Sequence, residues 1–181
     1  MGSEMIKVNQ CDKCPELARG RGQIVNGEGP LNAPLMIIGE APGREEDYNG
    51  RPFVGRSGKL LSATLAKLGI KREDVYITNV VKCRPPYNRK PFSQEIDRCL
   101  PNLLKEIASI TPRVIITLGL SATNAIINPG MTMGEINGQV FELGDAVVVP
   151  VYHPSAVLRN PNLRESFERA LKVAIEEAKK Q

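Results

Sequence analysis

Four cysteines are the residues of this sequence best suited to bind a metal. Cys11 and Cys14 form a C-x-x-C pair, a spacing that lets two thiolates from one turn reach the same ion or cluster. Cys83 and Cys99 flank a loop and the body of the helix predicted to follow it, so folding can bring all four together. The alternative is that Cys83 and Cys99 are small core residues, because free cysteine is often simply buried. Four thiolates suit zinc and an iron-sulfur cluster equally.

A glycine-rich segment between residues 39 and 59 raises the question of phosphate binding, since glycine allows close approach of the backbone. Residues 50–57 read G-x-x-x-x-G-R-S, whereas a nucleotide P-loop requires lysine before the serine. The dinucleotide pattern G-x-G-x-x-G does not follow the first predicted strand either. An enzyme that acts on nucleotides is therefore the weaker interpretation.

Two polar residues lie where predicted strands end. Asn79 follows a buried strand, and its side-chain amide carries the paired donor and acceptor that can read the edge of a base. Asparagine is also an ordinary turn-former at such positions. His153 is the only histidine of the chain and lies between the last predicted strand and a proline-stiffened loop. The ring of an isolated histidine is often simply hydrogen-bonded in the core or at the surface, without a function, but this position favours a catalytic role.

The elements that must position these residues alternate between strands and helices. Short apolar, β-branched runs predict buried strands over residues 35–38, 75–78, 114–118 and 147–151. The spacing of apolar residues predicts helices over 58–68, 93–109, 121–127 and 164–180. This alternation is typical of an α/β fold whose short, mainly parallel four-stranded sheet is covered by helices on both faces.

In such a sheet, functional groups gather at the carboxyl ends of the strands. We therefore expect Asn79, His153 and the 39–59 segment to meet at one edge. Residues 132–144 are expected to add a short hairpin before the last strand, because Asn137-Gly138 is a favourable pair for a tight turn. The 181 residues suit one domain, residues 1–181.

Composition and charge bear on the partners of the protein and on the compartment in which it is expected. A formal charge of +4 and a pI of about 8.9 are compatible with a polyanionic partner but do not require one. No window approaches about 18 uninterrupted apolar residues, the length that a membrane span needs. Residues 1–10 have polar breaks where a signal peptide needs an apolar stretch. We expect a cytoplasmic protein with no membrane partner, in a compartment where cysteines bind metal more often than they form disulfides.

Several segments taken together resemble the family 4 uracil-DNA glycosylases. The resemblance covers the chain from about Cys11 to Pro161, and the four cysteines match that family's cluster ligands. It is carried by the runs Gly39-Glu40-Ala41-Pro42-Gly43, Gly50-Arg51-Pro52-Phe53-Val54-Gly55, Lys82-Cys83-Arg84-Pro85-Pro86, Asn88-Arg89-Lys90-Pro91 and His153-Pro154-Ser155.

The resemblance implies a three-layer α/β/α fold and a DNA repair enzyme. Such an enzyme hydrolyses the N-glycosidic bond of deoxyuridine in single- or double-stranded DNA, releases uracil and leaves an abasic site. The resemblance also implies a [4Fe-4S] cluster, held by Cys11, Cys14, Cys83 and Cys99. We expect a monomer, and the sequence leaves contact with a sliding clamp open.

The resemblance also assigns the uracil site. Phe53 is expected to stack on the flipped uracil, and Asn79 to accept from N3–H and donate to O4. A donor at His153 is expected to stabilise the uracil anion at O2. The Glu40 carboxylate is expected to orient water or favour the sugar cation, with Asp47 as the second candidate. Glu40, Ala41 and Pro42 are expected to line the pocket.

A further set of residues is predicted to contact DNA. Val157 and Leu158 are expected to enter the vacated base stack, although they can also simply pack on the next helix. Arg84, Arg89 and Arg159 are expected on nearby phosphates.

Two rival functions remain: a nucleic-acid-binding module with bound zinc and no catalytic activity, and a hydrolase or transferase of nucleotides.

Overall fold

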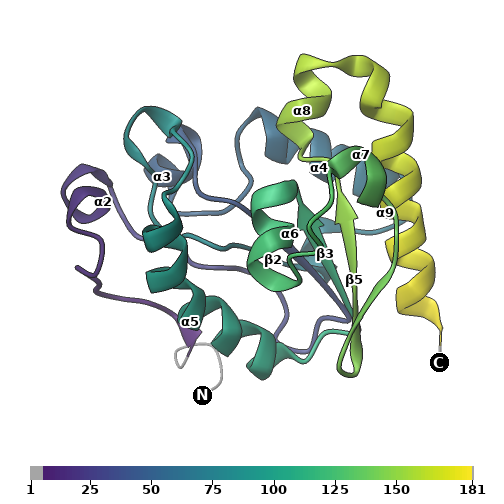
Figure 1. Cartoon of the computed structure of the whole chain (residues 1–181), viewed down its shortest axis with the longest axis horizontal. Coiled ribbons are helices and arrows are strands. Elements are labelled where there is room, and N and C mark those ends of the chain that lie inside the picture. The colour runs from purple at the N-terminus through teal and green to yellow at the C-terminus, as the bar shows by residue number, and fades with distance from the viewer. Residues whose placement is uncertain (1–5, 181) are drawn as a thin grey trace.

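The computed structural model describes residues 6–180, and a five-stranded sheet lies at its centre (Figure 1). The strands are β1 (Leu35–Gly39), β2 (Tyr76–Asn79), β3 (Val114–Leu118), β4 (Phe141–Leu143) and β5 (Ala146–Val151). Their order in the sheet is β2-β1-β3-β5-β4. β1 pairs in parallel with β2 and β3, and β3 pairs in parallel with β5. Only β4 runs antiparallel, along β5.

Helices connect and cover the strands. The α-helices are α2 (Pro15–Gly20), α3 (Arg44–Asn49), α4 (Arg56–Lys67), α5 (Ser93–Ile110), α6 (Leu120–Ile126), α7 (Met133–Ile136), α8 (Pro154–Arg159) and α9 (Arg164–Lys179). Short 3-10 helices cover Arg72–Asp74, Pro86–Asn88 and Pro161–Leu163. The four predicted helices are all present, and each starts and ends within two residues of the predicted bounds.

The two faces of the sheet belong to separate apolar cores. In β1, Leu35 and Ile37 face a core that also contains buried side chains of α4, α8 and α9. Met36 and Ile38 face the opposite core, to which α2, α5 and α6 contribute. Helices therefore cover both faces, which confirms the predicted three-layer α/β/α arrangement.

The sheet differs from the prediction by one strand. The four predicted strands are present with ends within one residue of the expected positions, but β4 adds a fifth. β4 has only three residues, and Glu142 and Leu143 within it are exposed, so it lacks the buried apolar run that marks the other strands. The hairpin turns at Gly144 and Asp145, not at Asn137-Gly138. Asn137 instead follows α7, and its Oδ1 accepts a hydrogen bond from Tyr152 N at 2.9 Å.

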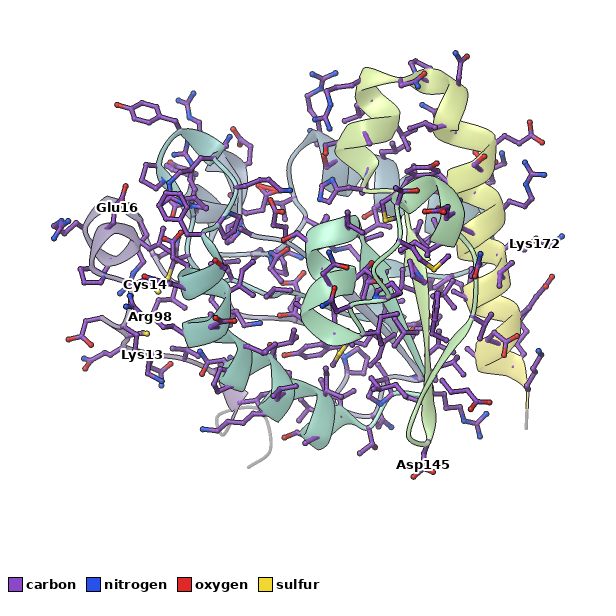
Figure 2. All side chains as sticks on the ribbon, in the orientation of Figure 1. Lys13, Cys14, Glu16, Arg98, Asp145 and Lys172 are labelled. Atoms are coloured by element: carbon purple, nitrogen blue, oxygen red, sulfur yellow. The ribbon has the colours of Figure 1, made fainter. Side chains whose placement is uncertain are left out.

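The parallel register places the ends of β1, β2, β3 and β5 at one edge of the sheet. Asp145, at the tip of the hairpin, lies at the opposite edge (Figure 2). Within residues 6–180, no helix combines the length and apolar character that crossing a membrane requires.

A close contact at Gly58 fixes the start of α4 against the loop before it. A methyl group on Gly58 would lie 1.9 Å from the carbonyl oxygen of Phe53. This neighbour is main chain and cannot turn aside as the end of a side chain can. Gly134 in α7 makes a contrast, because a methyl group there would find its nearest neighbours at 3.8 Å and 3.9 Å. Of these two glycines, only Gly58 lies where a side chain would collide with its neighbours.

We expect Gly58→Ala to lower the free energy of unfolding by about 2 kcal/mol, because the added methyl group forces the Phe53 loop away from α4. The matched variant Gly134→Ala should leave stability unchanged or raise it by up to ~1 kcal/mol, since alanine suits a helix better than glycine. Urea denaturation of both variants measures the difference. Equal effects of the two substitutions would contradict the close contact.

Candidate active site

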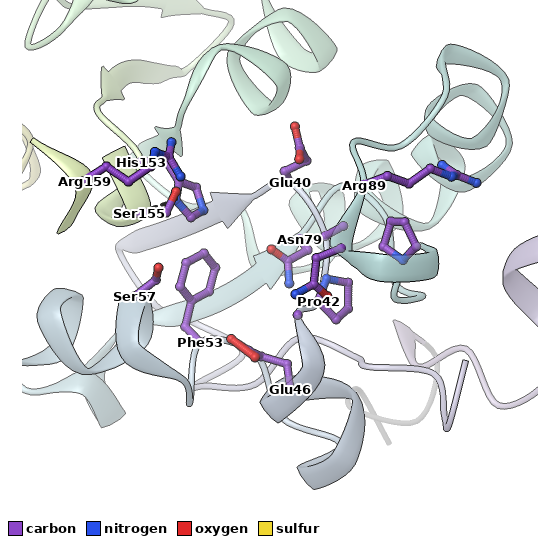
Figure 3. A pocket seen from close by; sticks show the side chains of 14 residues that line it. Glu40, Pro42, Glu46, Phe53, Ser57, Asn79, Arg89, His153, Ser155 and Arg159 are labelled. Atoms are coloured by element: carbon purple, nitrogen blue, oxygen red, sulfur yellow. Dashed lines mark hydrogen bonds between the residues drawn. The ribbon is translucent and has the colours of Figure 1, made fainter. Parts of the chain in front are cut away.

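A cavity opens at the carboxyl edge of the sheet (Figure 3). Its volume is about 320 Å³. The residues that line it are Glu40, Ala41, Pro42, Gly43, Glu46, Phe53, Ser57, Asn79, Pro85, Asn88, Arg89, His153, Ser155 and Arg159. The six residues predicted to bind uracil or to act in catalysis all lie in this lining, although they come from three separate loops.

Asn79 presents an unpaired acceptor to the cavity. The parallel register pairs Asn79 with Gly39, and the side chain of Asn79 turns toward the ring of Phe53 (Figure 3). Asn79 is 3% exposed, and within residues 6–180 its Oδ1 is a buried side-chain oxygen without a hydrogen-bond partner. An unpaired buried acceptor costs roughly 1 to 3 kcal/mol. The amide is therefore arranged to receive a donor from a ligand.

Phe53 is held in a backbone conformation that bulky residues rarely adopt. Its φ is 50°, in the left-handed region. Arg72 stabilises this conformation, because its guanidinium donates to the carbonyl oxygen of Phe53 at 2.5 Å and to that of Pro52. Glu28 in turn accepts a hydrogen bond from Arg72 at 3.2 Å. Phe53 is 5% exposed, and its ring centroid lies 5.9 Å from that of His153.

Gly39 allows Phe53 and Asn79 to meet at the end of β1. A methyl group on Gly39 would lie 2.4 Å from Phe53 Cζ and 2.5 Å from Asn79 Oδ1. The aromatic ring and the amide therefore occupy the space that any side chain at this position would need.

His153 precedes α8 and is fixed by Ser155. The backbone N–H of Ser155 donates to His153 Nδ1 at 3.0 Å, and Ser155 Oγ lies 2.7 Å from the same nitrogen. A backbone N–H can only donate, so Nδ1 must carry a lone pair. The proton of the neutral imidazole is therefore assigned to Nε2.

The surroundings of His153 also keep its ring uncharged. Burial lowers the pKa of His153 from 6.5 to about 4, and the guanidinium of Arg159 adds to this effect. At neutral pH the side chain is therefore a neutral donor through Nε2.

Three carboxylates near the site have different surroundings. Glu40 lines the cavity directly after β1, and Glu46 of α3 lines it from another side (Figure 3). Asp47 is instead occupied by the main chain of a distant segment. Its carboxylate accepts hydrogen bonds from Gly22 N at 2.9 Å and from Gln23 N at 3.3 Å. Asp47 is not among the residues that line the cavity, and its carboxylate anchors residues 22 and 23.

The four cysteines come together at the side of the molecule formed by the N-terminal segment and α5. Burial, followed by the nearby Cys99, raises the pKa of Cys14. Burial also raises the pKa of Cys83, while Arg21 lowers it and the thiols of Cys99 and Cys11 raise it further. These effects indicate that Cys83 lies near Cys99 and Cys11, and that Cys14 lies near Cys99, while the shared metal site stays a prediction. Figure 2 shows Cys14 and Arg98 beside each other, far from Lys172 of α9.

Nitrogen donors lie beside two of the cysteine sulfurs. Arg21 Nη1 lies 3.2 Å from Cys83 Sγ, and Asn102 Nδ2 lies 3.8 Å from Cys99 Sγ. Within residues 6–180, no group of three or more His, Cys, Asp or Glu side chains is arranged to hold a metal ion.

The three arginines predicted to contact DNA differ in their hydrogen bonds and ion pairs with other side chains. Arg159 is exposed at the edge of the cavity. Arg84 donates to Asn88 Oδ1 at 2.7 Å. Arg89 lines the cavity but is paired with Glu95 at 2.8 Å. Of the three, Arg159 is the one least engaged with other side chains.

One predicted DNA contact is wrong. Val157 is completely buried, in the core that also contains residues of α4 and α9, so its side chain cannot enter a base stack. Leu158, the next residue, is half-buried and remains a candidate. The predicted alternative, in which Val157 packs inside the protein, is the one the structure has.

Sequence reasoning missed several residues of the site. Arg72 belongs to no recognised motif, and only the fold brings it to Phe53. Glu46 lies in an acidic run typical of a solvated helix start. Ser155 is part of a motif that carries the family resemblance, but the motif alone gives it no role.

The single histidine makes a direct titration possible. We expect NMR of the imidazole to give a pKa of about 4 and a neutral ring protonated at Nε2, because Ser155 N donates to Nδ1. The folded pKa lies below the unfolded value, so the unfolded chain binds more protons between pH 6.5 and about 4. His153 should therefore lower the stability as the pH falls through this window, and His153→Gln should remove that component. A measured pKa near 6.5 or a proton on Nδ1 would contradict the assignment.

Comparison with known proteins identifies the family of this chain. The family model of the Uracil DNA glycosylase superfamily matches residues 26–177. The chain is 46% identical over 177 residues to the type-4 uracil-DNA glycosylase of Pyrobaculum aerophilum, covering 93% of this chain and 88% of the relative. It is 44% identical to the type-4 uracil-DNA glycosylase of Archaeoglobus fulgidus, covering 92% and 87%. For that of Thermotoga maritima the identity is 43%, covering 96% and 90%. The chain therefore belongs to the type-4 uracil-DNA glycosylases of the Uracil DNA glycosylase superfamily.

Proposed function

We propose that this protein removes uracil from DNA by hydrolysis of the bond between uracil N1 and deoxyribose C1′. The observation that carries this proposal is the buried, unpaired Oδ1 of Asn79, which faces a cavity that also holds an aromatic ring and a neutral histidine. The bond is hidden inside a duplex, so the nucleotide must flip out of the base stack before reaction. Phe53 offers its buried ring as the surface on which the flipped base stacks.

Asn79 selects uracil by its hydrogen-bonding pattern. Uracil donates from N3–H to Oδ1, which would fill the unpaired acceptor, and accepts at O4 from Nδ2. Cytosine reverses both partners, because its N3 accepts and its amino group donates. Each mismatched buried group costs roughly 1 to 3 kcal/mol.

His153 stabilises the leaving group. As the bond breaks, its electron pair passes to uracil and negative charge grows on O2, while C1′ becomes positive. The Nε2–H of a neutral His153 donates to O2 without a proton transfer, and Ser155 keeps Nε2 as the donor. Water then adds to C1′ and releases a proton, which leaves an abasic site.

Glu40 is our candidate for the carboxylate that orients this water or favours the sugar cation. It lies in the lining next to the end of β1, with the backbone of Ala41 and Pro42 beside it. Glu46 lines the same cavity and is the second acidic group available to the sugar. Both act in this proposal through their negative charge near C1′.

DNA is proposed to lie across the carboxyl edge of the sheet. Arg159 and Arg84 supply positive charge for phosphates at this edge, and the paired Arg89 lines the cavity beside them. Leu158 takes the place of the flipped nucleotide in the stack.

A [4Fe-4S] cluster is proposed on Cys11, Cys14, Cys83 and Cys99. The match of these four cysteines to the family's cluster ligands supports a cluster over zinc, and Arg21 beside Cys83 and Arg98 beside Cys14 supply positive charge for an anionic group. When bound, a cluster supplies a covalent link between the N-terminal segment, the loop after β2 and α5. It lies outside the cavity lining, so the residues of the cavity carry the chemistry.

We expect His153→Ala to lower the single-turnover rate of uracil excision by about a hundredfold or more, because it removes the donor to O2. Asn79→Asp should lower it by about tenfold or more, since the carboxylate cannot donate to O4. An oligonucleotide with one uracil and alkaline cleavage of the abasic product gives the rates. Binding to DNA that carries an abasic-site analogue is the control and should change little, as no base is present. Wild-type rates in both variants would remove these residues from the site.

Metal content separates the cluster from the rival zinc module. Protein purified without oxygen should contain about four iron atoms and as many acid-labile sulfides per chain, and no zinc. Cys83→Ser should lower the iron content and the melting temperature together. One zinc per chain, or no metal with unchanged stability, would exclude the proposed cluster.

A further inference from the structure

A buried ion pair lies directly behind the uracil-reading residue. Lys82 and Glu106 have side chains only 2% and 1% exposed, and Lys82 Nζ lies 2.6 Å from Glu106 Oε2. Lys82 belongs to the loop after β2, and Glu106 to α5. Removing two charges from water costs free energy that an apolar pair of similar size would not incur. Stability alone therefore gives no reason for this pair.

The contacts of the pair point toward Asn79. Lys82 Nζ donates to the carbonyl oxygen of Asn79 at 2.7 Å and to Thr78 Oγ1 at 2.5 Å. Glu106 accepts from Tyr76 OH at 3.0 Å and from Thr78 Oγ1 at 3.0 Å. The ammonium therefore binds the last residue of β2, and the carboxylate binds two side chains of the same strand.

The chain turns sharply between these contacts. Val80 N donates to the carbonyl of Gly39 at 2.9 Å, and Val81 N donates to that of Glu40 at 3.0 Å. Lys82 then folds its side chain back over three residues to the carbonyl of Asn79. The peptide that follows Asn79 is thus held through its N–H by Gly39, the last residue of β1, and through its carbonyl by the ammonium.

We propose that Lys82, held by Glu106, is a positioning residue that fixes the orientation of the Asn79 amide. This inference rests on the proposed role of Asn79 in reading uracil. Asn79 Oδ1 has no partner within residues 6–180, so side-chain hydrogen bonds of this oxygen do not fix the amide before uracil arrives. Its direction depends on the peptide that carries it. Loss of the ammonium leaves a buried carbonyl unpaired and removes one of the two contacts that hold this peptide.

A positioning role differs from a structural one in what it changes. It predicts weaker recognition of the base, with unchanged binding of the DNA backbone, at temperatures where the variant is folded.

The test variant is Lys82→Met with Glu106→Gln, because removal of Lys82 alone leaves the buried charge of Glu106 unpaired. Tyr76→Phe is the matched control within the cluster, since it removes a hydrogen bond to Glu106 and keeps the contact of Lys82 with Asn79. Lys67→Met with Glu168→Gln removes a surface pair instead.

Three quantities decide the proposal: the inhibition constant of free uracil, the single-turnover excision rate, and the dissociation constant for DNA with an abasic-site analogue. For Lys82→Met/Glu106→Gln, we expect uracil inhibition to weaken about tenfold and the excision rate to fall about tenfold or more, with abasic DNA bound as by the wild type. Tyr76→Phe should melt at a lower temperature with unchanged uracil inhibition. The surface double variant should match the wild type in all three.

Wild-type inhibition by uracil in folded Lys82→Met/Glu106→Gln, with only a lower melting temperature, would overturn the positioning role. If this variant does not fold, Lys82→Gln/Glu106→Gln replaces it, with the same expected directions and the same overturning result. Failure of the wild-type protein to release uracil would overturn the proposed function and this inference with it. A wild type that excises uracil beside a double variant with unchanged uracil inhibition would overturn this inference alone.

Discussion

The active site depends on a close contact at the end of β1, where Gly39 leaves room for the Phe53 ring and the Asn79 amide. The parallel register sets Asn79 beside Gly39, while the loop after β1 carries Phe53 back to the same point. Arg72 holds that loop by its carbonyl oxygens, and Gly58 lets α4 start directly behind it. The base-binding surfaces are therefore fixed by backbone approach, which tolerates no added side chain.

The polar groups of the cavity are matched to an uncharged base. Asn79 is buried, His153 is partly buried, and both are uncharged, so each offers a hydrogen bond without the cost of desolvating a charge. A neutral donor at His153 gains strength as charge develops on the leaving base, because the surroundings exclude water. The charged groups of the lining are the carboxylates of Glu40 and Glu46, the guanidinium of Arg89, which is paired with Glu95, and that of the exposed Arg159.

Much of this arrangement can be predicted from the sequence, for a physical reason. Buried parallel strands form continuous apolar runs, and their carboxyl ends meet at one edge, so the strand pattern alone places Asn79 and His153 together. Features that depend on tertiary contacts cannot be predicted in this way. Asp47 and Glu46 are neighbours in the sequence, yet contacts with residues 22 and 23 occupy only Asp47. Packing against the core likewise buries Val157 and leaves Leu158 partly exposed. β4 lies within the stretch expected to form a hairpin, but its bounds and its turn could not be predicted, because its three residues are partly or fully exposed and carry no pattern.

In the proposed mechanism, the unpaired Oδ1 of Asn79 accepts a hydrogen bond from the N3–H of uracil. A crystal structure of the protein with free uracil tests it most directly. The account predicts uracil against the Phe53 ring, with N3 about 2.9 Å from Asn79 Oδ1 and O2 within hydrogen-bond distance of His153 Nε2. Uracil bound with N3 turned away from Asn79, or bound outside this cavity, would contradict the account.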